Sequence, residues 1–180
     1  LASNKCFPLA DKTILKEIED KHLGAVQELI SVQQQSSVLS LVKKICNEAE
    51  DICNGIFLLR ELSARTKDRI VSYGELLSSQ IIAAKLNASG LVTEWKDARD
   101  FIVTDSNYSM AAVDFASTNK KASAFFAATI PSLFIIPGFI AADKNNITTT
   151  LGRGGSDYTA AILAAAVDAS VLEIWTDVSG

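Results

Sequence analysis

Cysteine, histidine and excess positive charge are all scarce in this sequence. Its 180 residues include three cysteines and one histidine, and 17 Lys and Arg against 21 Asp and Glu give a net charge of −4. Such a chain has no general attraction for a polyphosphate backbone, so nucleic acid is not expected as a partner. Cys46 and Cys53 lie about 10 Å apart along one predicted helix, too far for a disulfide, and unpaired thiols suit a cytoplasmic location.

Long hydrophobic runs are also missing. The most apolar stretch, residues 127–142, is interrupted by Pro131 and Pro137 well short of the about 20 residues that a membrane helix requires. It is better interpreted as buried strand, and no membrane association is expected. No charged and apolar leader of the secretory type is visible at the N-terminus.

The length allows one domain, and its first third has a helical pattern. Asp11 is a candidate N-cap, and apolar residues then recur three or four positions apart. The polar stretch at residues 33–37 could break the helix or be a solvated face of it. The charges along these helices are expected to face water. We assign no chemistry to this region, and we interpret His22, the only histidine, as a packed or surface residue.

From Arg69 the pattern alternates between strand and helix. Such alternation predicts an α/β fold with a mainly parallel sheet. Residues 143–146 are rich in turn formers and could join two strands as a hairpin. The predicted strands are residues 70–71, 91–95, 133–141, 147–151 and 171–175, and the predicted helices are residues 74–90, 111–128 and 156–169.

The most informative stretch is Leu151-Gly152-Arg153-Gly154-Gly155-Ser156-Asp157-Tyr158-Thr159-Ala160-Ala161, where a predicted strand passes through glycines into a helix. Glycines let a backbone approach a ligand closely, and the first turn of a helix attracts anions. A tight turn with Ser156 as N-cap and Arg153 in solvent is the alternative. The Gly-Lys-Ser/Thr ending of a P-loop is absent, and Asp157 stands where a dinucleotide fingerprint has its third glycine.

This stretch, together with Ile174-Trp175-Thr176-Asp177-Val178, resembles the aspartate kinase signature within the amino-acid kinase family. Ser72-Tyr73-Gly74-Glu75 resembles the family's Ser-x-Gly-Glu element, and Pro137-Gly138-Phe139 lies where the family has a Gly-Phe pair. The resemblance implies an incomplete three-layer αβα sandwich with a mainly parallel sheet, preceded by a helical segment. It also implies one partial catalytic domain, with a helical region at 1–66 and an α/β region at 67–180.

Residue roles follow from the same resemblance. Asp157 matches the aspartate that organises the catalytic lysine around the phosphates. Substrate contacts are implied for Glu75 with the ammonium group, for Arg153 with a carboxylate, and for Phe139, Gly154, Gly155 and Ser156. The nucleotide site is implied to include Gly138, Thr176 and Asp177, and no residue is assigned as a metal ligand.

The implied reaction is phosphorylation of the side-chain carboxylate of L-aspartate by ATP, with Mg²⁺, in a homo-oligomer. The family's Lys-Phe-Gly-Gly-Thr-Ser phosphate loop does not occur here, so we expect a fragment that is inactive by itself. Fusion to a homoserine dehydrogenase is possible. Other interpretations stay open: a kinase for glutamate, acetylglutamate or a nucleoside monophosphate, a small-ligand sensor, or a helical interaction module at residues 11–65.

Overall fold

The structure is a computed structural model that describes residues 12–128 and 133–175. The chain folds into two compact units, Leu1–Thr93 and Glu94–Gly180, and each is described by itself. Among the described residues, no helix is both long and apolar enough to cross a membrane.

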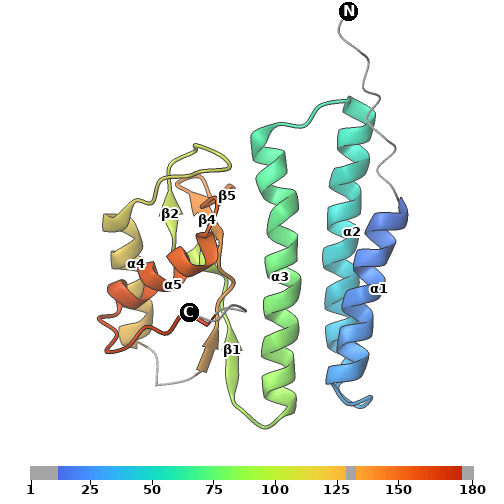
Figure 1. The fold of residues 1–180 in the computed structure, drawn as a ribbon, viewed down its shortest axis with the longest axis horizontal. Coiled ribbons are helices and arrows are strands. Elements are labelled where there is room, and N and C mark those ends of the chain that lie inside the picture. The colour runs from blue at the N-terminus through green and yellow to red at the C-terminus, as the bar shows by residue number, and fades with distance from the viewer. Residues whose placement is uncertain (1–11, 129–132, 176–180) are drawn as a thin grey trace, which may run out of the picture. The chain divides into compact units, whose positions relative to one another are not determined.

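Three helices make up the first unit: α1 (Lys12–Leu29), α2 (Gln35–Leu59) and α3 (Ala64–Ala88) (Figure 1). Val26 and Ile30 are buried, and so are Val42 and Ile45 of α2. These four residues belong to the core of this unit. The first two helices are separate, but the break lies at residues 30–34, while residues 35–37 begin α2. The Gln35 side chain bridges the break by donating to the carbonyl of Ile30 at 2.7 Å. The predicted cap Asp11 lies outside the described residues.

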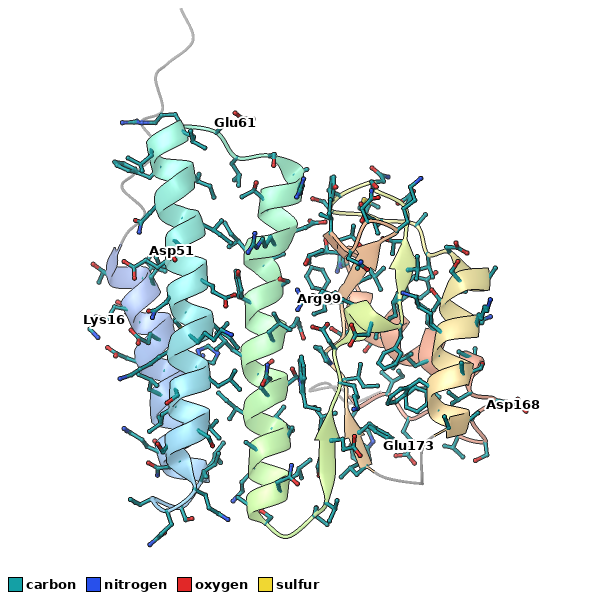
Figure 2. The ribbon with its side chains drawn as sticks, turned by 180° about the vertical axis from the view of Figure 1, so that it is seen from behind. Lys16, Asp51, Glu61, Arg99, Asp168 and Glu173 are labelled. Carbon is teal, nitrogen blue, oxygen red and sulfur yellow. The ribbon has the colours of Figure 1, made fainter. Side chains whose placement is uncertain are left out.

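The described charged side chains of α1 and α2 are exposed or partly exposed, as predicted, whereas Asp68 of α3 is buried. Lys16 pairs with Asp20 at 3.1 Å, both being well exposed, and Figure 2 shows Lys16 and Asp51 projecting away from their helices. An exposed pair of this kind contributes little to stability. The described cysteines, Cys46 and Cys53, are both free and half-buried, and burial raises the pKa of each thiol.

The predicted strand at Ile70 and Val71 is wrong, because one continuous helix runs from Ala64 to Ala88. The Ser63 hydroxyl accepts a hydrogen bond from the Thr66 N–H at 3.1 Å and caps the helix ahead of the supposed strand. Buried residues then recur at helical spacing along one face: Asp68, Ser72, Leu76, Ser79 and Ala83. Two β-branched residues have only a weak local preference for a strand, and the packing of this helix face overrides it.

The second unit combines short strands with helices (Figure 1). Strand β2 pairs in parallel with β4, and β4 pairs antiparallel with β5, so the predicted hairpin across residues 143–146 is confirmed. A second sheet holds β1 and β3. The elements are β1 (Thr93–Trp95), η1 (Ala98–Asp100), β2 (Val103–Thr104), α4 (Phe115–Ala128), β3 (Leu133–Ile135), β4 (Ile140–Asp143), β5 (Thr148–Thr150) and α5 (Gly155–Ala166).

Three sequence boundaries in this unit are corrected. The helix predicted from Ala111 begins at Phe115, because the Asp114 carboxylate accepts the Ser117 N–H at 3.1 Å and the Ser117 hydroxyl at 2.7 Å. The strand predicted over residues 133–141 is interrupted at 136–139. Residues 171–175, predicted as a strand, are irregular, and Trp175 is 87% exposed, since no described strand pairs with this segment.

Candidate functional site

The glycine-rich turn connects β5 to α5. Gly152 and Gly154 adopt left-handed backbone angles, with φ of 76° and 73°, which glycine adopts without steric cost. The Gly155 N–H donates to the Gly152 carbonyl at 3.1 Å, and Gly154 is the N-cap of α5. Ser156 is therefore not the N-cap, and its side chain lies exposed in the first turn. The other two parts of that alternative, a tight turn and an exposed Arg153, are observed.

A second turn, at Gly138 and Phe139, lies against the first. Phe139 also has a left-handed backbone, with φ of 68°, and the Ile140 N–H donates across it to the Gly138 carbonyl at 2.8 Å. The Leu151 N–H donates to the Phe139 carbonyl at 3.0 Å, which joins the two turns. A β-carbon on Gly138 would lie only 2.7 Å from the α-carbon of Ser156, so this close approach requires glycine.

The two turns expose a compact set of polar groups. Arg153, Ser156 and Asp157 are exposed, and Phe139 is half-buried beside them. Within the described part of the chain, the Arg153 and Asp157 side chains form no hydrogen bond or ion pair. A rigid helix N-terminus with a guanidinium group next to it is suited to binding a carboxylate or a phosphate. The structure thus brings together Gly138, Phe139, Arg153, Gly154, Gly155, Ser156 and Asp157.

Glu75 belongs to the other unit. It is half-buried on α3, and burial raises the pKa of its carboxyl group. The predicted helix at residues 74–90 would place Glu75 in its first turn, where the helix dipole favours a negative charge. Because α3 begins at Ala64, Glu75 lies about three turns further along, and this effect does not operate there. The remaining predicted site residues, Thr176 and Asp177, lie outside the described residues.

Sequence reasoning missed Thr159. This residue is 3% exposed within an alanine-rich helix, and its hydroxyl forms hydrogen bonds to both turns. The position of this hydroxyl, four residues after Gly155 and directly before the apolar run at residues 160–167, is a signal that could have identified it, because a buried hydroxyl needs a partner.

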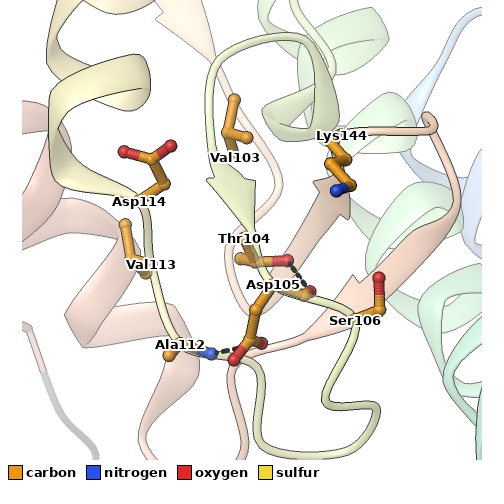
Figure 3. A pocket seen from close by; sticks show the side chains of 8 residues that line it. All are labelled: Val103, Thr104, Asp105, Ser106, Ala112, Val113, Asp114 and Lys144. Carbon is orange, nitrogen blue, oxygen red and sulfur yellow. Dashed lines mark hydrogen bonds between the residues drawn. The ribbon is translucent and has the colours of Figure 1, made fainter.

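An open pocket of about 480 Å³ in the same unit is separate from these turns. The pocket lies at the carboxyl end of β4, beside Lys144 (Figure 3). Phe139 precedes the amino end of the same strand, and the four residues of β4, at about 3.3 Å each, separate the two ends by about 13 Å. The carboxylates of the pocket accept hydrogen bonds from backbone N–H groups: Asp105 accepts from Ala112 at 2.9 Å, and Asp114 caps α4. We therefore assign it no chemistry.

Comparison with known proteins decides the family. The sequence profile of the amino acid kinase family matches residues 9–180. The chain belongs to this family. Among curated relatives, it is 35% identical over 169 residues to the chloroplastic bifunctional aspartokinase/homoserine dehydrogenase 1 of Arabidopsis thaliana. The aligned region covers 92% of this chain and 18% of that protein. It is 37% identical over 142 residues to the lysine-sensitive aspartokinase 3 of Escherichia coli, covering 76% of the chain and 32% of that protein.

Solved structures agree with the family. The crystal structure of E. coli aspartokinase III with lysine and aspartate superposes with a TM-score of 0.86 at 29% identity, covering 93% of this chain and 37% of that one. The same enzyme with aspartate and ADP gives a TM-score of 0.85 at 30% identity, covering 94% and 37%. The amino-acid kinase fold predicted from the signature is thereby confirmed. The chain spans less than half the length of each of these relatives.

Proposed function

We propose that the complete polypeptide carrying this sequence is an aspartate kinase, which transfers the γ-phosphoryl group of ATP to the side-chain carboxylate of L-aspartate. The observation that supports this most is the rigid pair of turns that presents Arg153, Ser156 and Asp157 together. Both curated relatives described above are named aspartokinases, which supports the same proposal. In this proposal, residues 1–180 form part of one catalytic domain, with a helical region at 1–66 and an α/β region at 67–180.

The nucleophile of this reaction needs no general base. A free carboxylate of this type has a pKa near 4, so it is ionised at neutral pH. The protein must instead hold two anions together in line, and its cations and backbone dipoles must offset their repulsion. We assign Arg153 to a substrate carboxylate, the N–H groups of Gly154 and Ser156 to anionic oxygens, and Phe139 to the wall of the pocket. Gly155, whose N–H donates to the Gly152 carbonyl, shapes the turn that presents these groups.

The other roles follow from the same assignment. Glu75 binds the ammonium group of aspartate, for which its carboxyl group must be ionised, so its raised pKa predicts weaker binding on acidification. Asp157, an exposed carboxylate, organises the catalytic lysine around the phosphates. Gly138, Thr176 and Asp177 complete the nucleotide site.

Magnesium fits this arrangement as the partner of ATP. No group of three or more His, Cys, Asp or Glu residues suited to a metal occurs among the described residues. Mg²⁺ in kinases is held by one or two carboxylates and by the phosphates themselves, and no residue of this chain is assigned as its ligand. When bound, the ion neutralises phosphate charge. We also propose a cytoplasmic homo-oligomer, for which the free thiols and the family resemblance are the support.

The test is ADP formation by the complete polypeptide with ATP and magnesium, supplied separately with aspartate, glutamate, acetylglutamate or a nucleoside monophosphate. We expect turnover with aspartate and its loss in Asp157→Asn, which removes the charge and keeps the shape. Turnover with a different acceptor would retain the family and refute the substrate. Absence of turnover with every acceptor would favour a ligand sensor.

A further inference from the structure

A buried hydroxyl joins the two turns of the candidate site, in addition to the hydrogen bond between the Leu151 N–H and the Phe139 carbonyl. The Phe139 N–H donates to the Thr159 Oγ1 at 3.0 Å, and the Thr159 Oγ1 donates to the Gly155 carbonyl at 2.8 Å. The hydroxyl proton is thus directed into α5, which leaves a lone pair of the oxygen to accept from Phe139. Because Thr159 is 3% exposed, water has little access to replace either bond.

The backbone that Thr159 holds is an unfavourable one. A residue with a β-carbon rarely adopts the left-handed angles of Phe139, and such a residue persists only where its surroundings enforce them. Three hydrogen bonds act on this turn, through the N–H groups of Phe139, Ile140 and Leu151. Of these, only the bond to Thr159 has a side chain as its acceptor, so a single substitution can remove it while the main chain stays unchanged.

Close packing also connects this bond to the exposed polar groups. A β-carbon on Gly155 would lie 2.9 Å from the Cδ2 of Phe139 and 3.1 Å from its α-carbon, so the ring and the first turn of α5 lie in direct contact. Gly138 is equally close to Ser156. A shift of the Phe139 turn would therefore change its position relative to Ser156 and Asp157.

We propose that Thr159 is a positioning residue for the acceptor substrate: its hydroxyl fixes Phe139 against the N-terminus of α5, so that Phe139 and Ser156 meet the substrate in one geometry. This inference rests on the proposed function for its kinetic part. Its structural part concerns only the hydrogen bond between Phe139 and Thr159.

The test compares Thr159→Val, which replaces the hydroxyl with a methyl group of similar size, with Thr159→Ser, which keeps the hydroxyl. Leaving the Phe139 N–H unpaired should raise the KM for aspartate on the order of tenfold with kcat little changed. Amide hydrogen exchange at Phe139 should accelerate by a similar factor. Thr159→Ser should restore both values.

Thr118→Val is the matched control. Thr118 is also a fully buried helical threonine, and its Oγ1 accepts the Val103 N–H at 3.0 Å, but it belongs to α4 and contacts neither turn through a hydrogen bond. This variant should lose a comparable amount of stability and keep the wild-type KM. An equal rise in KM in both valine variants would overturn the inference, because it would reveal a general effect of destabilisation.

Hydrogen exchange separates the two proposals. If the wild-type polypeptide shows no turnover with aspartate, the proposed function fails, and exchange at Phe139 still decides the role of Thr159. If Thr159→Val does not fold, the wild type suffices: slow exchange of the Phe139 N–H supports the buried bond, and exchange at the rate of an exposed amide overturns it.

Discussion

Gly55 and Gly155 both lie in helices, yet an added methyl group would meet different surroundings. Apart from its chain neighbours and the backbone of its own helix, Gly55 in α2 has no atom within 4 Å of an ideal β-carbon, whereas the same atom on Gly155 would meet Phe139 at 2.9 Å and 3.1 Å. We expect Gly55→Ala to raise the free energy of unfolding by about 0.5–1 kcal/mol, because alanine loses less backbone entropy. Gly155→Ala should lower it by about 1–3 kcal/mol through overpacking.

Urea unfolding of the two variants beside the wild type measures both effects. Equal shifts of the same sign would contradict the expectation, since they would show that the packing around Phe139 adjusts without cost. The sequence predicted a continuous strand through Pro137 and Gly138, and it did not predict that Phe139 would adopt the left-handed conformation. That angle depends on Thr159 and Leu151, which are distant in sequence.

At the scale of an element, α3 shows how a cap can decide a structure. The Ser63 hydroxyl accepts from the Thr66 N–H at 3.1 Å and starts a 25-residue helix through the β-branched pair at Ile70 and Val71. Ser63→Ala should lower the free energy of unfolding by about 1 kcal/mol, while Ser63→Asp, which keeps an acceptor at the cap, should retain most of it. Urea unfolding measures the difference. Equal loss in both variants would show that the cap is not the source.

Elements were predictable where their pattern was long or their turn chemistry specific. The α1 and α2 stripes, the hairpin at 143–146 and the glycine turn before α5 are of this kind. Prediction failed at residues 70–71 and 171–175, where short apolar runs with β-branched residues were taken for strands. Strand preference is expressed only where a neighbouring strand supplies hydrogen bonds, and local sequence cannot show whether one does.

At the scale of the whole molecule, ligand binding links the site to stability. A ligand that binds only the folded state stabilises it by about 2.7 kcal/mol at 100 times its dissociation constant. Aspartate should therefore stabilise the complete polypeptide against urea, and glutamate should not. Because Arg153 is exposed and forms no hydrogen bond or ion pair with the described residues, Arg153→Ala should leave the stability without ligand within about 0.5 kcal/mol.

The same substitution should remove most of the stabilisation by aspartate, because Arg153 is proposed to bind its carboxylate. Arg99→Ala is the matched control: Arg99 donates to Asp97 at 2.9 Å and to the Thr148 hydroxyl at 3.1 Å, so its loss acts on the scaffold. We expect Arg99→Ala to lower the free energy of unfolding without ligand and to keep the stabilisation that aspartate provides. If Arg153→Ala keeps the full increment, Arg153 does not bind the substrate, and the glycine turn must hold a different anion.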